Sequence, residues 1–445
     1  METRASLLVL GGTVVAMDES LTVIEGGGIA IDGTRIVAVG PDEEIEAAFR
    51  RQGTEVIDAG GRLVLPGLVN THTHAADILF RGLVEDLPLE PWLERLWRVE
   101  REHVSPGSVA AGSRLAQAEM IRGGTTTALD MFFFPEEAVA VARRTGFRLA
   151  TGPFFFDSPD VDGIEARERA PRARELLEEL RDDALLVPCL LAHSTYTVAP
   201  SLLEAGRDLA AEFGALFSTH VAETRAEVET VQRMHGNSPP RHLDRLGVLE
   251  MPTVLAHCVH LTRDEIELLA ERDSAVAHCP MSNLKLGSGV APIPSLRGAG
   301  VRTTLGTDGP VSSNDLDLWA TLRLGAVLHK GVGGDPRLMP AREVFAQATI
   351  EGARALGLGD RIGSIEKGKE ADLVIVDLDR PHLVPLHDVY AHLVYAVGRD
   401  DVRTVLIQGR IVMQDRRLTT IDEQAAMEEV AELAARLRRS GPQLV

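Results

Sequence analysis

The fold of this chain is decided by Leu65-Pro66-Gly67-Leu68-Val69-Asn70-Thr71-His72-Thr73-His74. The residues before the two histidines are mostly apolar and predict a short buried strand. Side chains alternate between the two faces of a strand, so His72 and His74 point the same way. Two imidazoles at one strand end can bind the same divalent cation, whereas the ordinary alternative is a pair of hydrogen-bonded histidines. The remaining ligands must come from elsewhere in the chain.

Seven further short apolar runs follow, and amphipathic helical stretches separate most of them. The predicted strands are Leu65–Asn70, Thr125–Asp130, Arg148–Thr151, Leu185–Ala192, Leu216–Val221, Thr253–His257, Ala275–His278 and Thr303–Asp308. Eight strand and helix units over about 300 residues are the count of a (β/α)8 barrel. A doubly wound sheet is the structural alternative, but no glycine-rich phosphate loop follows the first strand.

Short β-rich runs with glycine-containing turns occupy both ends of the chain. The two sets resemble each other in length and turn chemistry, which favours one domain built from both ends. We therefore predict the α/β class: a (β/α)8 TIM barrel with a small composite β-sandwich domain. The expected limits are 1–65 and 363–418 for the composite sandwich, 66–362 for the metal-binding barrel and 419–445 for a C-terminal helix.

The charge and composition exclude several classes of partner. The formal net charge is −20, and such an acidic surface repels phosphate backbones and anionic lipids, so we expect neither nucleic acid nor membrane partners. The three cysteines fit a reducing compartment, and no cleavable leader or membrane-spanning run is expected. Cytoplasmic localisation is therefore the prediction. The chain has four lysines, none in the first half of the barrel, which favours one metal over a pair bridged by carboxylated lysine.

Three other predicted strands also end in side chains that can take part in chemistry. His220 and Glu223 lie at the end of the fifth strand, His257 at the end of the sixth, and Asp308 at the end of the eighth. Each residue alone has an ordinary interpretation as a core histidine, a turn residue or a solvated carboxylate. Barrel active sites, however, are built where the strands end, and all of these residues fall there.

We assign His72, His74, His220 and Asp308 to one divalent metal ion per chain. Three imidazoles and a carboxylate that leave room for water suit a catalytic first-row ion, with Zn2+ expected and Fe2+ or Mn2+ as alternatives. Such an ion lowers the pKa of bound water from about 15.7 towards 7.

At this point the sequence resembles the amidohydrolase superfamily, in the branch of the 5-methylthioadenosine/S-adenosylhomocysteine deaminases and related chlorohydrolases. The resemblance covers essentially the whole chain. It rests on the opening stretch together with Arg81-Gly82-Leu83, Gly123-Gly124-Thr125-Thr126-Thr127, His220-Val221-Ala222-Glu223-Thr224, Ala256-His257-Cys258-Val259-His260-Leu261, Ser282-Asn283-Leu284-Lys285-Leu286-Gly287, Gly306-Thr307-Asp308-Gly309, Gly363-Ser364-Ile365-Glu366-Lys367-Gly368 and Ala371-Asp372-Leu373.

The resemblance implies a role for each site residue. Glu223 would protonate a ring nitrogen of the substrate, and Asp308 would take a proton from the attacking water and pass it to the leaving ammonia. His257 would orient and polarise that water. Glu100 and His193 hold the positions that contact the substrate in this branch.

The sequence differs from this branch at two places that bear on the choice of substrate. The place after the third strand reads Thr151-Gly152-Pro153-Phe154-Phe155-Phe156, without the arginine that can hold an amino-acid carboxylate. Arg167 or Arg169 could substitute, but we interpret both as ordinary faces of a charged helix. Cys279 stands where adenosine-type enzymes more often carry asparagine, which is similar to guanine-type and triazine-type relatives.

Aromatic residues gather near the same rim. Six of the twelve phenylalanines lie in Phe132–Phe134 and Phe154–Phe156, and Trp92 and Trp97 lie in what we expect to be a long loop. These rings could simply pack loops on the barrel. They also offer flat apolar surface for a heterocycle, and we hypothesise a preference for uncharged purine nucleosides or methylthio-type substrates over those bearing a free amino acid.

The sequence thus predicts a metal-dependent hydrolytic deaminase of an adenine-bearing nucleoside of the methylthioadenosine, deoxyadenosine or S-adenosylhomocysteine type. The alternatives within enzymes are deamination of guanine, cytosine or a pterin, or dechlorination of a triazine. A non-catalytic relative would be expected to have lost ligands, and none is missing here. The partner is a small N-heterocycle, and a homo-oligomer is compatible with the resemblance.

Overall fold

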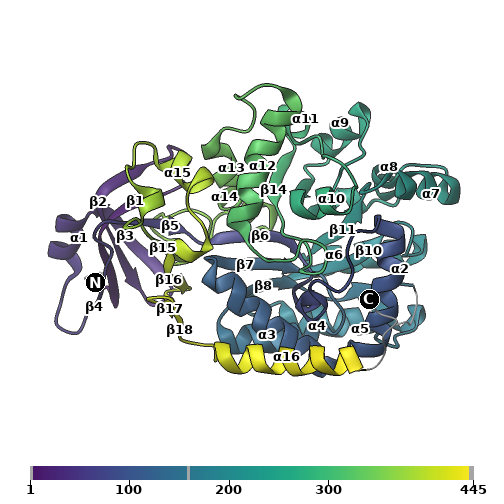
Figure 1. Ribbon diagram of the computed structural model, residues 1–445, viewed down its shortest axis with the longest axis horizontal. Helices are drawn as coiled ribbons and strands as arrows, with labels where there is room; N and C mark the ends of the chain where they lie inside the picture. The colour runs from purple at the N-terminus through teal and green to yellow at the C-terminus, as the bar shows by residue number, and fades with distance from the viewer. Residues whose placement is uncertain (1–3, 158–160, 440–445) are drawn as a thin grey trace.

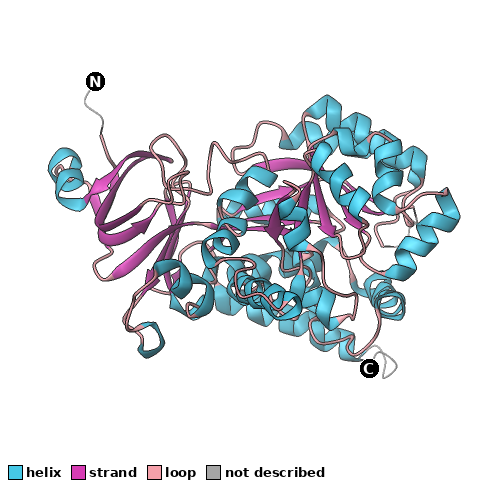
Figure 2. Cartoon of the chain, turned by 90° about the horizontal axis from the view of Figure 1, so that it is seen from above, coloured by secondary structure: helices cyan, strands magenta, loops and turns pink. Residues whose placement is uncertain are grey.

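A computed structural model describes residues 4–157 and 161–439. Within them, the strands form two sheets that lie side by side, and helices surround one of the two (Figures 1 and 2). No helix among these residues is both long and apolar enough to cross a membrane.

The larger unit is the predicted parallel barrel. Its strands run in the order β14-β13-β12-β11-β10-β8-β7-β6, all paired in parallel. The Thr71 hydroxyl contacts that of Thr304 at 2.6 Å and donates to the Leu305 carbonyl at 3.0 Å, which joins β6 to β14. The bounds are β6 (Leu68–Thr73), β7 (Thr125–Asp130), β8 (Arg148–Thr151), β10 (Leu186–Ser194), β11 (Leu216–Val221), β12 (Thr253–His257), β13 (Ala275–His278) and β14 (Arg302–Leu305), with the short β9 (Phe154–Phe155) beside β10.

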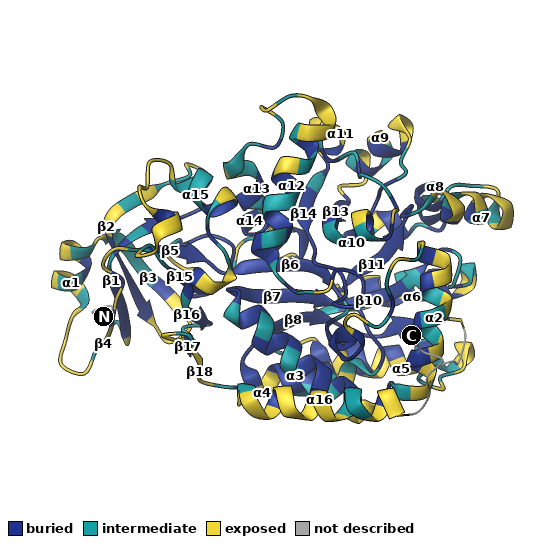
Figure 3. Cartoon of the chain, viewed as in Figure 1, coloured by how far each residue is buried: buried dark blue, intermediate teal, exposed yellow. Residues whose placement is uncertain are grey.

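Helices cover the barrel, and their inner faces are buried while their outer faces are exposed (Figure 3). They are α2 (Leu89–His103), α3 (Pro106–Arg122), α4 (Pro135–Thr145), α5 (Ala166–Leu180), α6 (Pro200–Phe213), α7 (Arg225–His235), α8 (Pro239–Arg245), α9 (Arg263–Glu271), α10 (Pro280–Lys285), α11 (Ile293–Gly298), α12 (Leu318–Gly333), α13 (Ala341–Gln347) and α14 (Ile350–Ala355). The C-terminal helix α16 (Glu423–Arg439) packs along α3, as Figure 1 shows.

The second sheet takes strands from both ends of the chain, as predicted. Its order is β18-β17-β16-β15-β5-β1-β2-β3, with β4 beside β1. The bounds are β1 (Leu7–Val15), β2 (Val23–Asp32), β3 (Arg35–Pro41), β4 (Glu55–Asp58), β5 (Arg62–Pro66), β15 (Leu373–Asp377), β16 (Val402–Ile407), β17 (Arg410–Gln414) and β18 (Arg417–Leu418), and α1 (Asp42–Phe49) and α15 (Val389–Tyr395) accompany them. The residue limits of the two domains remain the proposal made from the sequence.

A buried ion cluster joins this sheet to the barrel. Arg148, at the start of β8, has no exposed side-chain surface, and all three of its guanidinium nitrogens donate hydrogen bonds. The acceptors are both oxygens of Asp372, the carboxylate of Glu370 and the Ala184 carbonyl. Arg361 donates to the other oxygen of Glu370 at 2.8 Å. Every charge in this cluster therefore has an opposite partner.

The eighth strand, predicted to reach Asp308, ends at Leu305. Two further differences from the sequence prediction concern the fold. The strand predicted over 65–70 is two strands, because the chain leaves the composite sheet at Pro66 and enters the barrel at Leu68. Gly67 allows the passage, since a Cβ there would lie 2.1 Å from the Thr126 hydroxyl. The long loop expected around Trp92 and Trp97 is the helix α2, which turns both rings inwards.

Candidate active site

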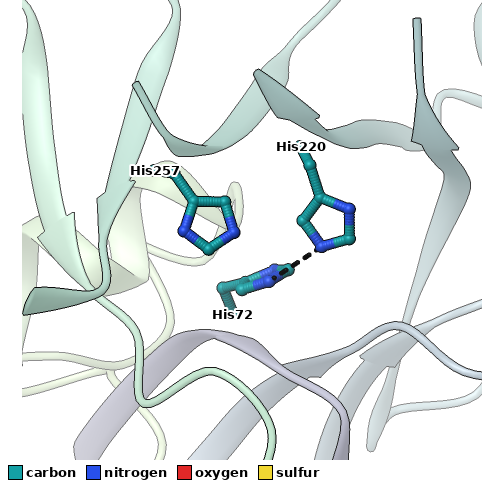
Figure 4. Close-up of side chains that lie close together, drawn as sticks. All are labelled: His72, His220 and His257. Carbon is teal, nitrogen blue, oxygen red and sulfur yellow. Dashed lines mark hydrogen bonds between the residues drawn. The ribbon is translucent and has the colours of Figure 1, made fainter. Parts of the chain in front are cut away.

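Four side chains from three barrel strands meet at the end of the barrel where these strands finish. His72 lies in β6 and His74 directly after it, His220 lies in β11, and Asp308 follows β14. The Nε2 of His220 is 3.2 Å from the Nε2 of His72 and 3.2 Å from that of His74. The Asp308 Oδ1 lies 3.5 Å from the Nε2 of His72 and 3.2 Å from that of His74. Figure 4 shows the rings of His72 and His220 converging, with His257 beside them.

These separations fit a shared cation. Ligand atoms about 2.0–2.1 Å from a tetrahedral ion lie about 3.3 Å from one another. The outer nitrogens of two rings are also fixed: the Nδ1 of His74 donates to the Met131 carbonyl at 2.6 Å, and that of His220 to the His193 carbonyl at 2.6 Å. A proton at Nδ1 leaves the Nε2 lone pair facing the centre, as metal-ligating histidines require. The residues present therefore fit a divalent metal ion.

The charges within this cluster shift its pKa values strongly. Burial lowers the pKa of His72 to about 4. Burial also acts to lower the pKa of His74, but the hydrogen bond to Asp308 raises it to about 10. Burial acts to raise the pKa of Asp308, yet the two histidines hold it well below its usual range. A cation at this place would compete with the proton of His74, since ligands bind metal in the deprotonated form.

His257 lies beside the four candidate ligands and is oriented differently from them. Its ring could also join His72 and His220 in a ligand group. The Asn283 amide nitrogen, however, lies 2.9 Å from the His257 Nδ1 and can only donate, so a neutral His257 carries its proton on Nε2. That nitrogen faces the site, 3.6 Å from the Glu223 Oε2. His257 is thus arranged as a hydrogen-bond donor.

Glu223 is buried at the same pocket, three residues after His220. Burial, with the nearby charge of Asp308, raises the pKa of Glu223 to about 8. The carboxyl is therefore protonated at neutral pH and can donate a proton to a bound molecule.

Glu100 and His193 lie in the wall of the same pocket. Burial raises the pKa of Glu100 to about 7 and lowers that of His193 to about 3. Glu100 adjoins the buried carboxyl of Asp77, which the sequence reasoning did not single out. The structure thus brings all eight residues singled out from the sequence to one cavity or its floor.

The cavity has a volume of about 730 Å3 and is largely aromatic on one side. Trp97 lies 5.7 Å from Phe156, and Phe133 lies 5.0 Å from Phe154, each pair edge to face. The described residues that line the cavity include five carboxylic acids and no arginine or lysine. Its wall can therefore receive flat apolar groups and hydrogen-bond donors.

The two arginines considered as substitutes lie outside this wall. Arg167 is exposed, as expected of a charged helix face. Arg169 is only 3% exposed, so its interpretation as an ordinary helix face is wrong. It is paired with both oxygens of Asp162 and donates to the Phe154 carbonyl, which locks it inside the protein. Cys279 is also buried and is not a lining residue itself, but its thiol lies beside the lining residues His257, Asp308 and Glu223.

Several residues at the site were missed by the sequence reasoning. Asn283 and Ser288 lie in the segment after β13, and their contacts to His257 and Glu223 span 26 and 65 residues, which no local pattern reveals. Glu227 could have been found, because Thr224 and Glu227 have the spacing of a capping box at a helix start.

Comparison with known proteins agrees with this geometry. The sequence profile of the amidohydrolase family matches residues 63–412, and that of an imidazolonepropionase-like composite domain of bacteria matches residues 27–50. A 5-methylthioadenosine/S-adenosylhomocysteine deaminase of Syntrophobacter fumaroxidans is 43% identical over 438 residues, covering 98% of this chain and 99% of the relative.

Two solved structures are also similar along nearly the whole chain. An adenosine deaminase from Xanthomonas campestris with bound zinc has a TM-score of 0.95 at 39% identity and covers 99% of this chain and 100% of its own. The zinc complex of atrazine chlorohydrolase from Arthrobacter aurescens has a TM-score of 0.90 at 26% identity, with coverage of 96% and 100%.

The fold and the site therefore define a barrel hydrolase with a metal-binding cluster. The chain belongs to the amidohydrolase family, and it is an enzyme.

Proposed function

We propose that this enzyme is a hydrolytic deaminase of adenine-bearing nucleosides that replaces the amino group of the ring with oxygen and releases ammonia. The observation that carries this proposal is the meeting of the four candidate ligands, a protonated Glu223 and an aromatic wall in one cavity. The 5-methylthioadenosine/S-adenosylhomocysteine deaminase relative and the adenosine deaminase structure support the adenine ring as the substrate group.

His72, His74, His220 and Asp308 would hold one divalent metal ion, which we propose to be Zn2+. Their nitrogen and carboxylate atoms suit zinc, and the structure from Xanthomonas campestris contains zinc. The ion, when bound, lowers the pKa of water and so supplies a nucleophile at neutral pH.

The surrounding residues then divide the proton transfers. Glu223 gives its proton to the ring nitrogen beside the amino-bearing carbon, which makes that carbon more electrophilic. His257 donates from Nε2 to the attacking water and orients it. Asp308 accepts one proton from the water and delivers it to the departing amino group, and the other proton of the water returns to Glu223, so one water is consumed and one ammonia is released. Glu100 and His193 bind the rest of the nucleoside.

The lining of the cavity favours a nucleoside with an uncharged tail, such as methylthioadenosine or 5′-deoxyadenosine. A free amino-acid carboxylate would face carboxylic acids and aromatic rings, with no arginine or lysine among the described lining residues. Because Arg169 is held by Asp162, it cannot serve as that cation without breaking a buried ion pair.

The test is ammonia release from methylthioadenosine, 5′-deoxyadenosine, adenosine, S-adenosylhomocysteine, guanine, cytosine, a pterin and an aminotriazine, with metal analysis of the purified enzyme. We expect bound zinc and the highest kcat/KM for the first two compounds. A clear preference for S-adenosylhomocysteine would contradict the uncharged tail, and activity on other heterocycles alone would contradict the adenine ring.

Hydrolytic dechlorination of a triazine is the second candidate, and the similarity to atrazine chlorohydrolase favours it. The same cation and the same Glu223 would serve both reactions. Chloride release from a chlorotriazine, measured beside the ammonia assay, separates the two. We further propose that the enzyme acts in the cytoplasm and as a homo-oligomer, which fractionation and light scattering can test.

A further inference from the structure

The turn that presents Glu223 is held by a second glutamate. The backbone N–H groups of Ala222 and Glu223 donate to the two carboxylate oxygens of Glu227, at 2.9 and 2.6 Å. Ala222 has a φ of 50°, a left-handed conformation that is strained for a residue with a side chain. Two hydrogen bonds to one carboxylate at this point stabilise that conformation.

This arrangement differs from an ordinary helix cap. At the start of α9, the Glu265 carboxylate accepts from the N–H of Thr262, the capping residue itself, at 2.7 Å. At the start of α7, Thr224 is the capping residue, but the Glu227 carboxylate bonds to the two residues before it. Both glutamates are buried, at 6% and 3% exposed. Glu227 thus holds the backbone of the proposed proton donor, whereas Glu265 caps its helix and accepts a hydrogen bond from the Ser238 hydroxyl, away from Glu223.

The side chain of Glu223 is fixed separately. The Ser288 hydroxyl donates to the Glu223 Oε1 at 3.2 Å, which leaves Oε2, the oxygen nearest His257, to carry the proton. Ser288 is itself tied to the same turn through His260. The His260 Nε2 donates to the Ser288 carbonyl at 2.8 Å, and the His260 N–H donates to the Ala222 carbonyl at 2.9 Å.

We propose that Glu227 and Ser288 are positioning residues, which fix the backbone and the carboxyl of Glu223 so that its Oε2 faces the substrate ring nitrogen. This proposal rests on the deaminase function proposed above. Ser288 is not a lining residue of the cavity, and Glu227, which borders it, has both carboxylate oxygens bonded to the turn. Both act through Glu223, by restricting it to one orientation.

The first test is Glu227→Gln, with Glu265→Gln as the matched control. An amide can accept only one of the two N–H groups and turns its NH2 towards the other, so the turn loses a bond and gains a clash. We expect kcat to fall about 10- to 100-fold, as for other residues that orient a catalytic group, with KM and zinc content near those of the wild type. Glu265→Gln should keep the wild-type kcat. Equal kcat in the two variants, or a loss of kcat that follows a loss of zinc, would overturn the proposal.

The second test is Ser288→Ala against Ser288→Thr, which restores the hydroxyl. We expect the alanine variant to lose about 10-fold in kcat and the threonine variant to recover most of it. Equal losses in both would overturn the role of the hydroxyl.

Hydrogen–deuterium exchange provides a readout that needs no activity. Glu227→Gln should speed exchange at Ala222 and Glu223, whereas Glu265→Gln should leave these amides unchanged. Unchanged exchange in Glu227→Gln would contradict the backbone clamp. A wild type that releases no ammonia from any compound of the panel would contradict the proposed function instead, and the exchange result would still decide whether Glu227 holds the turn.

Discussion

The barrel carries a buried polar cluster at each end, and the two are built in opposite ways. At the start of β8, Arg148 is surrounded by Glu370 and Asp372, and its guanidinium is fully hydrogen-bonded. At the other end, three imidazole nitrogens face one another at 3.2 Å or nearly so, and the Nδ1 of His72 has no hydrogen-bond partner among the described residues. The first cluster neutralises itself, whereas the second gathers three imidazoles around one carboxylate, an arrangement that can also hold a cation.

The cluster around Arg148 therefore contributes to stability, and the histidine cluster contributes to function. A self-neutralised cluster holds the composite sheet to the barrel and offers nothing to a ligand. A cluster of like groups that face one another destabilises the folded chain and provides ligands for a metal. The two ends should therefore respond differently to substitution.

The largest expected effect is at the catalytic end. Glu223→Gln removes the proton donor and keeps its shape, so kcat for the preferred nucleoside should fall about 10²- to 10⁴-fold. Zinc content should stay near the wild-type value, because Glu223 is not a proposed ligand. A variant that keeps its turnover would remove Glu223 from the mechanism.

The next effect is at the other end. Arg148→Met leaves the buried Glu370 and Asp372 without one of their cations, which should lower the free energy of unfolding by about 3–5 kcal/mol. Urea denaturation measures this loss. The KM of the folded fraction should not change, and Arg143→Met, at an exposed ion pair, provides the control with a loss of at most about 1 kcal/mol.

A smaller effect concerns the orientation of His257. Asn283→Asp replaces the donor to the His257 Nδ1 with an acceptor, so the ring proton moves to Nδ1 and Nε2 can no longer donate to water. We expect kcat to fall about 10- to 100-fold, with zinc retained. Asn237→Asp, in the loop between α7 and α8, makes the same change of charge outside the cavity lining. This control variant should keep the wild-type kcat. Wild-type kcat in Asn283→Asp would contradict the assigned tautomer.

The last effect, the smallest per step of the measured variable, is the pH dependence of stability, and its sign should differ between the ends. Burial raises the pKa of Glu223 to about 8, so its contribution to stability falls as the pH rises from its unfolded value near 4.3 through about 8. For Glu370, burial acts to raise the pKa, but the hydrogen bond from Arg361 and the charge of Arg148 lower it overall. Its contribution is present above pH 4.3 and is lost as the pH falls through the lowered value.

Urea denaturation at several pH values checks both signs. Compared with the wild type, Glu223→Gln should flatten the decline between pH 5 and 8, and Glu370→Gln should flatten the loss on the acid side. The expected change is about 1 kcal/mol per pH unit for each group. If the free energy of unfolding changed with pH in the same way in the wild type and in both variants, the opposite signs expected at the two ends of the barrel would be contradicted.

The sequence alone determined the barrel strands and the proposed metal ligands, because both depend on local patterns. Runs of four to six β-branched or apolar residues mark strands such as Thr125–Asp130 and Ala275–His278. Polar residues at the ends of such strands must lie at the same end of a parallel barrel. The His72 and His74 pair follows in the same way from strand alternation.

Only the tertiary structure decided which groups support those residues and which side chains line the cavity. The sequence prediction missed helix α2 because two prolines and mixed polarity hide its pattern. Its apolar side packs in a buried core cluster and also lines the cavity. The sequence predicts an exposed helix charge at Arg169, whereas the structure shows it buried in an ion pair with Asp162. Ser288 meets Glu223 across 65 residues of chain. Such a contact depends on how distant segments pack together, so it cannot be predicted from the spacing of residues along the chain.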